Sequence, residues 1–65
     1  MMNWTDSLEI AIALEESHPE IDPKKINFVD LRQFVRGLDE FEEGESRCGE
    51  RVLEAIQMHW IEEKS

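Results

Sequence analysis

Five carboxylates lie within seven consecutive positions around a single phenylalanine in the stretch LDEFEEGE, residues 38–45. They are Asp39, Glu40, Glu42, Glu43 and Glu45. Carboxylate oxygens are hard donors that suit Mg²⁺, Ca²⁺, Mn²⁺ and Fe²⁺, and a dense negative surface also attracts basic proteins. The stretch therefore predicts one of three roles: solvation of a small protein, a metal site, or a docking surface for a basic partner.

The twelve-residue stretch 39–50 resembles an EF-hand calcium loop at four positions, but it fails at two others. Its third position is Phe41, which offers no side-chain oxygen, and its ninth is the cation Arg47. A high-affinity calcium site is therefore excluded. What the pattern still favours is a weakly held cation on exposed acids. The candidate metal ligands are Asp39, Glu40, Glu42 and Glu43.

Nucleophilic and histidine-based chemistry finds no support in the spacing. His18, His59 and Cys48 lie on different predicted elements, without the intervals of a ligand set.

A single cysteine cannot form an internal disulfide, which favours a reducing compartment. The start MMNWTDS has no secretory pattern, and the longest apolar run, IAIAL, is too short to span a bilayer. We expect a cytoplasmic location.

The charge balance points to basic protein partners. The net charge is −9 over 65 residues, and the charges are segregated. Residues 1–22 hold six acids and no Lys or Arg, whereas residues 23–36 hold four basic residues and one acid. Such a field repels nucleic acid and anionic membranes.

A chain this short builds only a small core and no deep pocket, so we expect neither an enzyme nor a tightly bound cofactor.

The first predicted helix positions part of this charge. It should begin at NWTDS, capped by Thr5, Asp6 or Ser7, with Asp6 and Glu9 at capping-box spacing. It should stop near His18, because the following proline disfavours helical geometry before it. Its inward residues are Ile10, Ala11 and Leu14. Asp6, Glu9, Ala13 and Glu16 fall within about 80° on another side.

The remaining elements are a connector and two helices. The connector 19–28 carries two prolines, and Ile26 and Phe28 alternate with polar residues in a way that allows a strand of three residues. A second helix is predicted over 29–38 and a third over 49–64. Their apolar faces are Leu31, Phe34, Val35 and Leu38, and Val52, Leu53, Ile56 and Trp60.

These elements predict one mainly α domain, residues 1–65, with three helices and at most a very short sheet. The order matches a helix-turn-helix or winged-helix arrangement. Such folds often bind DNA, and Arg32 and Arg36 with Lys24 and Lys25 form the only basic cluster. The overall charge of −9 opposes phosphate binding, so DNA is disfavoured.

Docking to a protein accounts for more of the pattern. The acids of the first helix and of residues 39–45 could form one negative face, with Leu8, Ile12 and Phe41 as apolar anchors. In protein complexes charge mainly guides and orients the partners, whereas buried apolar contacts keep them together. The alternative for Phe41 is that its ring packs back into the core and closes the corner between the last two helices.

Several motifs in order resemble the IscX family, the small acidic proteins of bacterial iron–sulphur cluster assembly. They are WTDS at 4–7, Asp22–Pro23, Phe28-x-Asp30-Leu31, Leu38-Asp39-Glu40-Phe41 followed by acids, Glu50-x-x-Leu53-Glu54-Ala55-Ile56, and Trp60. The resemblance covers the whole chain. It implies a modified winged-helix fold, no enzymatic activity, weak ferrous iron binding through surface acids, and docking on cysteine desulfurase, the pyridoxal-phosphate enzyme that supplies sulphur.

Carried over by position, the resemblance implies a defined acidic face. Its partner-binding residues are Asp6, Glu9, Glu16, Asp30, Asp39, Glu40, Glu42 and Glu43. The expected function is that of a monomeric regulator or adaptor of the desulfurase. The alternative is an iron donor that delivers Fe²⁺ to the cluster scaffold. The scaffold and the ferredoxin of the same system are further partners that the resemblance implies.

Overall fold

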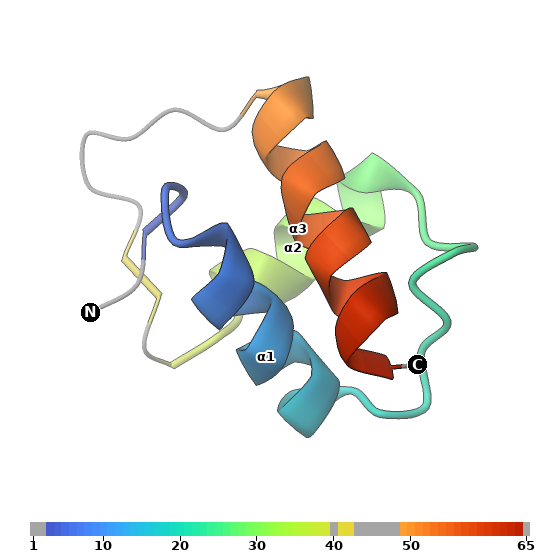
Figure 1. Ribbon diagram of the computed structural model, residues 1–65. Coiled ribbons are helices and arrows are strands. Elements are labelled where there is room, and N and C mark those ends of the chain that lie inside the picture. The colour runs from blue at the N-terminus through green and yellow to red at the C-terminus, as the bar shows by residue number, and fades with distance from the viewer. Residues whose placement is uncertain (1–2, 40, 43–48, 65) are drawn as a thin grey trace.

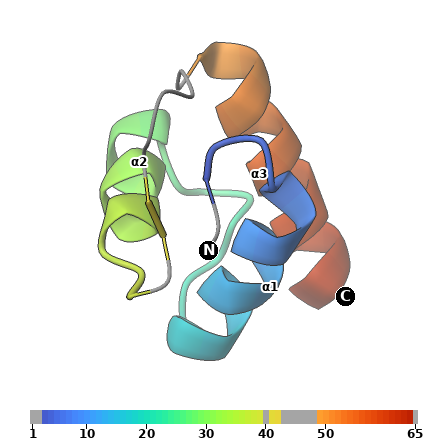
Figure 2. The same cartoon turned by 90° about the vertical axis from the view of Figure 1, so that its left-hand side faces the viewer.

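Three α-helices make up the protein in the computed structural model, which describes residues 3–39, 41–42 and 49–64. They are α1 (Ser7–Ser17), α2 (Phe28–Arg36) and α3 (Glu50–Lys64). α1 and α3 run side by side in the same direction, and α2 covers one side of that pair (Figures 1 and 2). The prediction of a mainly α, three-helix domain is confirmed. Within the described residues the only β-type feature is a single bridge position at Phe41, so the winged-helix arrangement stays a prediction.

The core lies where the three helices meet. Its buried side chains are Trp4, Ile10, Ala11, Leu14, Leu31, Val35, Leu53, Ile56 and Trp60. The inward face predicted for α1 is confirmed, because Ile10, Ala11 and Leu14 are fully buried. Trp4 precedes the first helix and is not among the inward residues predicted for it. Its indole is nevertheless only 1% exposed.

The start of α1 differs from the predicted cap. Asp6 is the N-cap residue, but its side chain makes no capping hydrogen bond. A tight turn over residues 3–6 instead lets the backbone N–H of Asn3 donate to Asp6 Oδ2 at 3.0 Å. The predicted end is confirmed, because His18 is the C-cap and its N–H donates to the carbonyl of Leu14 at 2.7 Å.

α2 begins earlier than predicted, and the short strand at Ile26–Phe28 was wrong. Asn27 is the N-cap: its Oδ1 accepts from the backbone N–H of Asp30 at 2.8 Å, and its Nδ2 donates to Asp30 Oδ2 at 3.3 Å. This reciprocal cap turns the chain into a helix at Phe28, where the alternation alone suggested an extended segment. The helix ends at Arg36, with Gly37 as its C-cap.

The connector between α1 and α2 is held against α3. Pro23 is buried, and Gln57 of α3 donates from Nε2 to its carbonyl oxygen at 2.9 Å. α3 itself begins one residue later than predicted and buries Leu53, Ile56 and Trp60, whereas Val52 is only half-buried. The connector is therefore anchored on α3 a few residues before α2 begins.

Candidate functional site

An open hollow lies between the C-terminal half of α1 and the segment that follows α2. It has a volume of about 220 Å³ and is lined by Ala13, Glu16, Ser17, Leu38 and Asp39. Glu16 and Asp39 are exposed, whereas Ala13 and Leu38 are half-buried and pack against the core. Two carboxylates therefore border a small, mostly polar space, to which Ala13 and Leu38 add an apolar part. Such a space suits the guanidinium of an arginine, or the stem and ammonium of a lysine, from another protein.

The hollow brings together two residues that the sequence assigned to the partner-binding face. Glu16 comes from α1, and Asp39 comes from the chain after α2. Ala13, which the helical spacing placed on the same side as Glu16, has only a methyl side chain and leaves this space open. The sequence placed both acids on the surface, but no spacing rule shows that they border one space. That both acids bind a partner stays a prediction.

The acidic strip of α1 is the side that carries Asp6, Glu9, Ala13 and Glu16, and its other two acids differ in exposure. Glu9 is exposed but does not line the hollow. Asp6 is half-buried, and its carboxylate already accepts the Asn3 N–H. An acid that is held by the backbone is less available to a partner than one that projects into solvent, so Glu9 and Glu16 form the more accessible part of the strip.

Two apolar side chains accompany this strip. Leu8 is 49% exposed and Ile12 is 38% exposed. They are four residues apart on α1, so they share one stripe of the helix, next to the stripe of Glu9 and Glu16. The two residues therefore present a small apolar surface beside an acidic one, as the docking interpretation expects.

Phe41 packs inward. Its ring meets the buried indole of Trp4 edge to face, with ring centroids 4.7 Å apart and planes at 72°, and the side chain is half-buried. The prediction that this ring packs into the core is thus confirmed, whereas its closing of the corner between the last two helices stays a prediction. The same contact leaves its described neighbours Asp39 and Glu42 exposed. Glu40, Glu43 and Glu45 lie outside the described residues, as do Arg47 and Cys48.

Asp30 stands apart from these acids. It is exposed on the first turn of α2, where its carboxylate accepts from the side chain of Asn27. Negative charge there stabilises the helix dipole. Asp30 does not line the hollow of Glu16 and Asp39, and its assignment to the partner-binding face stays a prediction.

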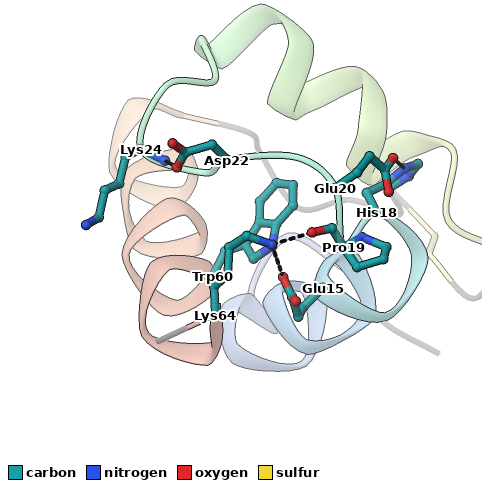
Figure 3. A network of polar contacts seen from close by, with 8 residues as sticks. All are labelled: Glu15, His18, Pro19, Glu20, Asp22, Lys24, Trp60 and Lys64. Carbon is teal, nitrogen blue, oxygen red and sulfur yellow. Dashed lines mark hydrogen bonds and ion pairs between the residues drawn. The ribbon is translucent and has the colours of Figure 1, made fainter.

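One acid of α1 has a structural role that sequence reasoning missed. Glu15 Oε1 accepts from Nε1 of the buried Trp60 at 3.0 Å and pairs with Lys64 Nζ at 3.3 Å (Figure 3). Lys64 Nζ also donates to the carbonyl oxygen of Pro19. These contacts join the ends of α1 and α3. The missed signal was a tryptophan whose N–H needs an acceptor when it is buried.

A larger hollow adjoins this network, and its lining favours neither a positive nor a negative ligand. Its volume is about 420 Å³, and its charged lining consists of Glu20, Asp22, Lys24 and Lys64. Two acids and two lysines balance one another. In addition, Asp22 Oδ1 accepts the Lys24 N–H at 3.0 Å. The hollow of Glu16 and Asp39 is the better candidate, because every charged residue described in its lining is an acid.

The described residues contain no group of three or more His, Cys, Asp and Glu placed to hold a metal ion. Of the four candidate ligands, Asp39 and Glu42 are described, and both are exposed. His18 is the C-cap of α1, with its ring 4.7 Å from that of Phe34 and its Nδ1 3.9 Å from Glu20 Oε1. Exposed carboxylates suit hard cations, but without an enclosed coordination sphere they hold them weakly.

Comparison with known proteins decides the family. A family model described as iron-sulphur cluster assembly matches residues 2–65. The chain belongs to this family, the IscX family. An uncharacterized protein of Pseudomonas aeruginosa is 60% identical over 63 residues, which cover 97% of this chain and 96% of that protein.

Membership of the IscX family sets the context of the acidic surface. IscX proteins form an accessory family of iron–sulphur assembly rather than a known enzyme family. Partners of this IscX-family chain are therefore to be sought within the assembly system. Among the helices of the described residues, none is both long and apolar enough to cross a membrane.

Proposed function

We propose that this protein is a non-enzymatic regulator of iron–sulphur cluster assembly that docks its acidic face on a basic surface of cysteine desulfurase. The observation that carries the proposal is the hollow in which Glu16 and Asp39 border one space over Ala13 and Leu38. A lysine or arginine of the desulfurase enters that space and pairs with both carboxylates.

The neighbouring apolar stripe slows dissociation of the docked complex. Exposed charges mainly raise the association rate, whereas buried apolar contacts slow dissociation. Leu8 and Ile12 are the exposed large apolar side chains of α1. They become covered when Glu9 and Glu16 engage the basic surface. The docked protein then occupies the region around the desulfurase active site and thereby modulates sulphur transfer.

Iron has a secondary place in this proposal. Asp39 and Glu42, with Glu40 and Glu43, bind Fe²⁺ weakly, since their carboxylate oxygens are suitable donors for it. A bound cation would neutralise part of the acidic face and weaken docking on a basic partner. The iron-donor alternative reverses this order, because a donor must carry Fe²⁺ before it visits its partner.

The test is a titration of isotope-labelled protein with cysteine desulfurase in chelated buffer at low and high salt. Glu16→Gln and Asp39→Asn should each weaken binding about tenfold at low salt, because each removes one carboxylate from the hollow. Glu62→Gln is the matched control: it also removes one charge, but from an exposed position near the end of α3. It should change the affinity less than about twofold.

Three results separate the candidate functions. Salt-sensitive binding that shifts the amides of Glu9, Glu16 and Asp39 supports docking. If Glu62→Gln weakened desulfurase binding as much as Glu16→Gln and Asp39→Asn, the loss would come from net charge alone. That result would contradict a defined docking site. Binding that requires Fe²⁺ would make the iron-donor function the leading one.

A further inference from the structure

A third hollow lies between α2 and α3. Its volume is about 300 Å³. The residues that line it are Phe28, Val29, Arg32, Gln33, Arg36 and Leu53. Among the described residues two arginines border it and no acid does, in a protein of net charge −9. None of its described lining residues also lines the hollow of Glu16 and Asp39.

The helix geometry makes this surface continuous. Positions 29, 32, 33 and 36 follow the i, i+3, i+4, i+7 spacing and form one stripe along α2. The core residues Leu31 and Val35 lie on a different side of the helix, as does Phe34, whose ring contacts His18. The stripe therefore has no role in the core.

The lining combines apolar and cationic groups. Val29 is 68% exposed, which is unusual for a β-branched aliphatic side chain, and Leu53 forms an apolar floor at 6% exposure. Arg32 is exposed and forms no ion pair within the described part of the chain. An arginine presents a planar fork of donors that matches a carboxylate in two hydrogen bonds.

We infer that this groove is a docking site for an acidic segment of a partner protein that also carries an apolar side chain. The apolar side chain lies against Val29 and Leu53, and a neighbouring carboxylate pairs with Arg32. The inference is independent of the proposed function. With both surfaces occupied, the protein would hold a basic and an acidic partner at once.

The negative charge of the rest of the protein does not prevent such binding. At physiological ionic strength the Debye length is about 8 Å, and the molecule measures 31 by 22 by 17 Å. Acids on the far side of α1 are therefore largely screened at the groove. The nearest acid of α2, Asp30, lies outside the groove lining and has its carboxylate on Asn27.

An acidic protein segment fits better than a nucleic acid. A nucleic acid presents a continuous row of phosphates, and its binding requires several cations spread along the surface. Among the described residues, only two arginines border the groove, beside an apolar floor. A segment with few charges and one apolar side chain uses both features and meets less repulsion from the net charge.

The experiment uses a fluorescent synthetic peptide of glutamates and leucines as the probe, with the full-length protein. We expect binding that shifts the amides of Val29, Arg32, Gln33 and Leu53 in NMR spectra. Arg32→Glu should weaken binding about tenfold. Arg51→Glu is the matched control, because it makes the same charge change at an exposed position of α3 outside the groove, and it should weaken binding less than about twofold.

A second pair of probes tests the apolar part and the class of ligand. Val29→Ser should also weaken peptide binding, and a peptide with serine in place of leucine should bind poorly. Circular dichroism confirms that each variant is folded. The inference is overturned by absent shifts in the groove, by equal losses for Arg32→Glu and Arg51→Glu, or by equal binding of the serine peptide. Tighter binding of a thymidine oligonucleotide at the same residues would overturn it as well.

Discussion

The ring of Phe41 meets the indole of Trp4 edge to face, with 4.7 Å between the centroids. Trp4 lies before the first helix and Phe41 after the second, so this contact ties two distant parts of the chain together. It also explains how a phenylalanine can sit among five acids. The ring is turned into the protein, while Asp39 and Glu42 remain exposed on either side of it.

Phe41→Ala should therefore destabilise the protein and loosen the acidic segment. Loss of a half-buried aromatic ring and its edge contact costs about 1–3 kcal/mol. In a domain of this size that lowers the melting temperature by roughly 4–8 °C per kcal/mol. Near-ultraviolet circular dichroism should report the change at Trp4.

Met58→Ala is the matched control for Phe41→Ala, because Met58 is 57% exposed on α3. Its truncation should change the free energy of unfolding by less than about 0.5 kcal/mol. Equal effects of the two substitutions would contradict the structural role of the Phe41–Trp4 contact.

Glu15 and Glu16 are neighbours on α1 with different roles, so their substitutions should separate stability from binding. Glu15→Ala removes the acceptor of the buried Trp60 N–H and the partner of Lys64. Leaving a buried donor without a partner costs about 1–3 kcal/mol, and urea unfolding measures this loss. Glu16→Ala should leave the free energy of unfolding within about 0.5 kcal/mol but weaken desulfurase binding. The opposite result would reverse the two assignments.

Asn27→Ala should destabilise the start of α2. The substitution removes the side-chain oxygen that accepts the Asp30 N–H, at a cost of about 1 kcal/mol. Asn27→Ser keeps a capping oxygen and should retain most of the stability. Hydrogen exchange at the first turn of α2 measures the difference. Equal protection in both variants would show that the cap does not hold the helix.

Fe²⁺ binding should depend on carboxylates and not on imidazoles. Under anaerobic conditions Asp39→Asn and Glu42→Gln should each weaken the iron affinity several-fold, because hard oxygen donors are removed. His18→Ala and His59→Ala are the controls and should leave the iron affinity unchanged. Paramagnetic broadening of NMR signals locates the ion. Loss of binding in either histidine variant would instead indicate a mixed nitrogen–oxygen site.

Much of the fold was predictable from local pattern. The prolines, the apolar periodicity and the caps act over a few residues, so the extents of α1 and α3 and the inward residues Ile10, Ala11 and Leu14 followed from them. The start of α2 was missed because two signals competed. Alternating Ile26 and Phe28 suggested a strand, and the side chain of Asn27 turned the chain into a helix instead.

The candidate site was predictable residue by residue, but not as a site. Composition and helical spacing placed Glu9, Glu16 and Asp39 on the surface, because ionised groups are costly to bury. Only the packing of α1 against the chain after α2 shows that Glu16 and Asp39 border one hollow. Packing also distinguishes the roles of two neighbouring acids: Glu15 accepts a hydrogen bond from Trp60, and Glu16 lines the hollow.

The sequence by itself thus determined that there are three helices, the charge segregation and the family, since each depends on residue types and short spacings, whereas it did not give the start of α2. The tertiary structure decided which acids share a space, that Trp4 is buried, that Phe41 turns inward, and that Arg32 lies over an apolar groove. These features depend on contacts between residues far apart in the chain. Such contacts form only when the helices pack around a common core, which no local pattern specifies.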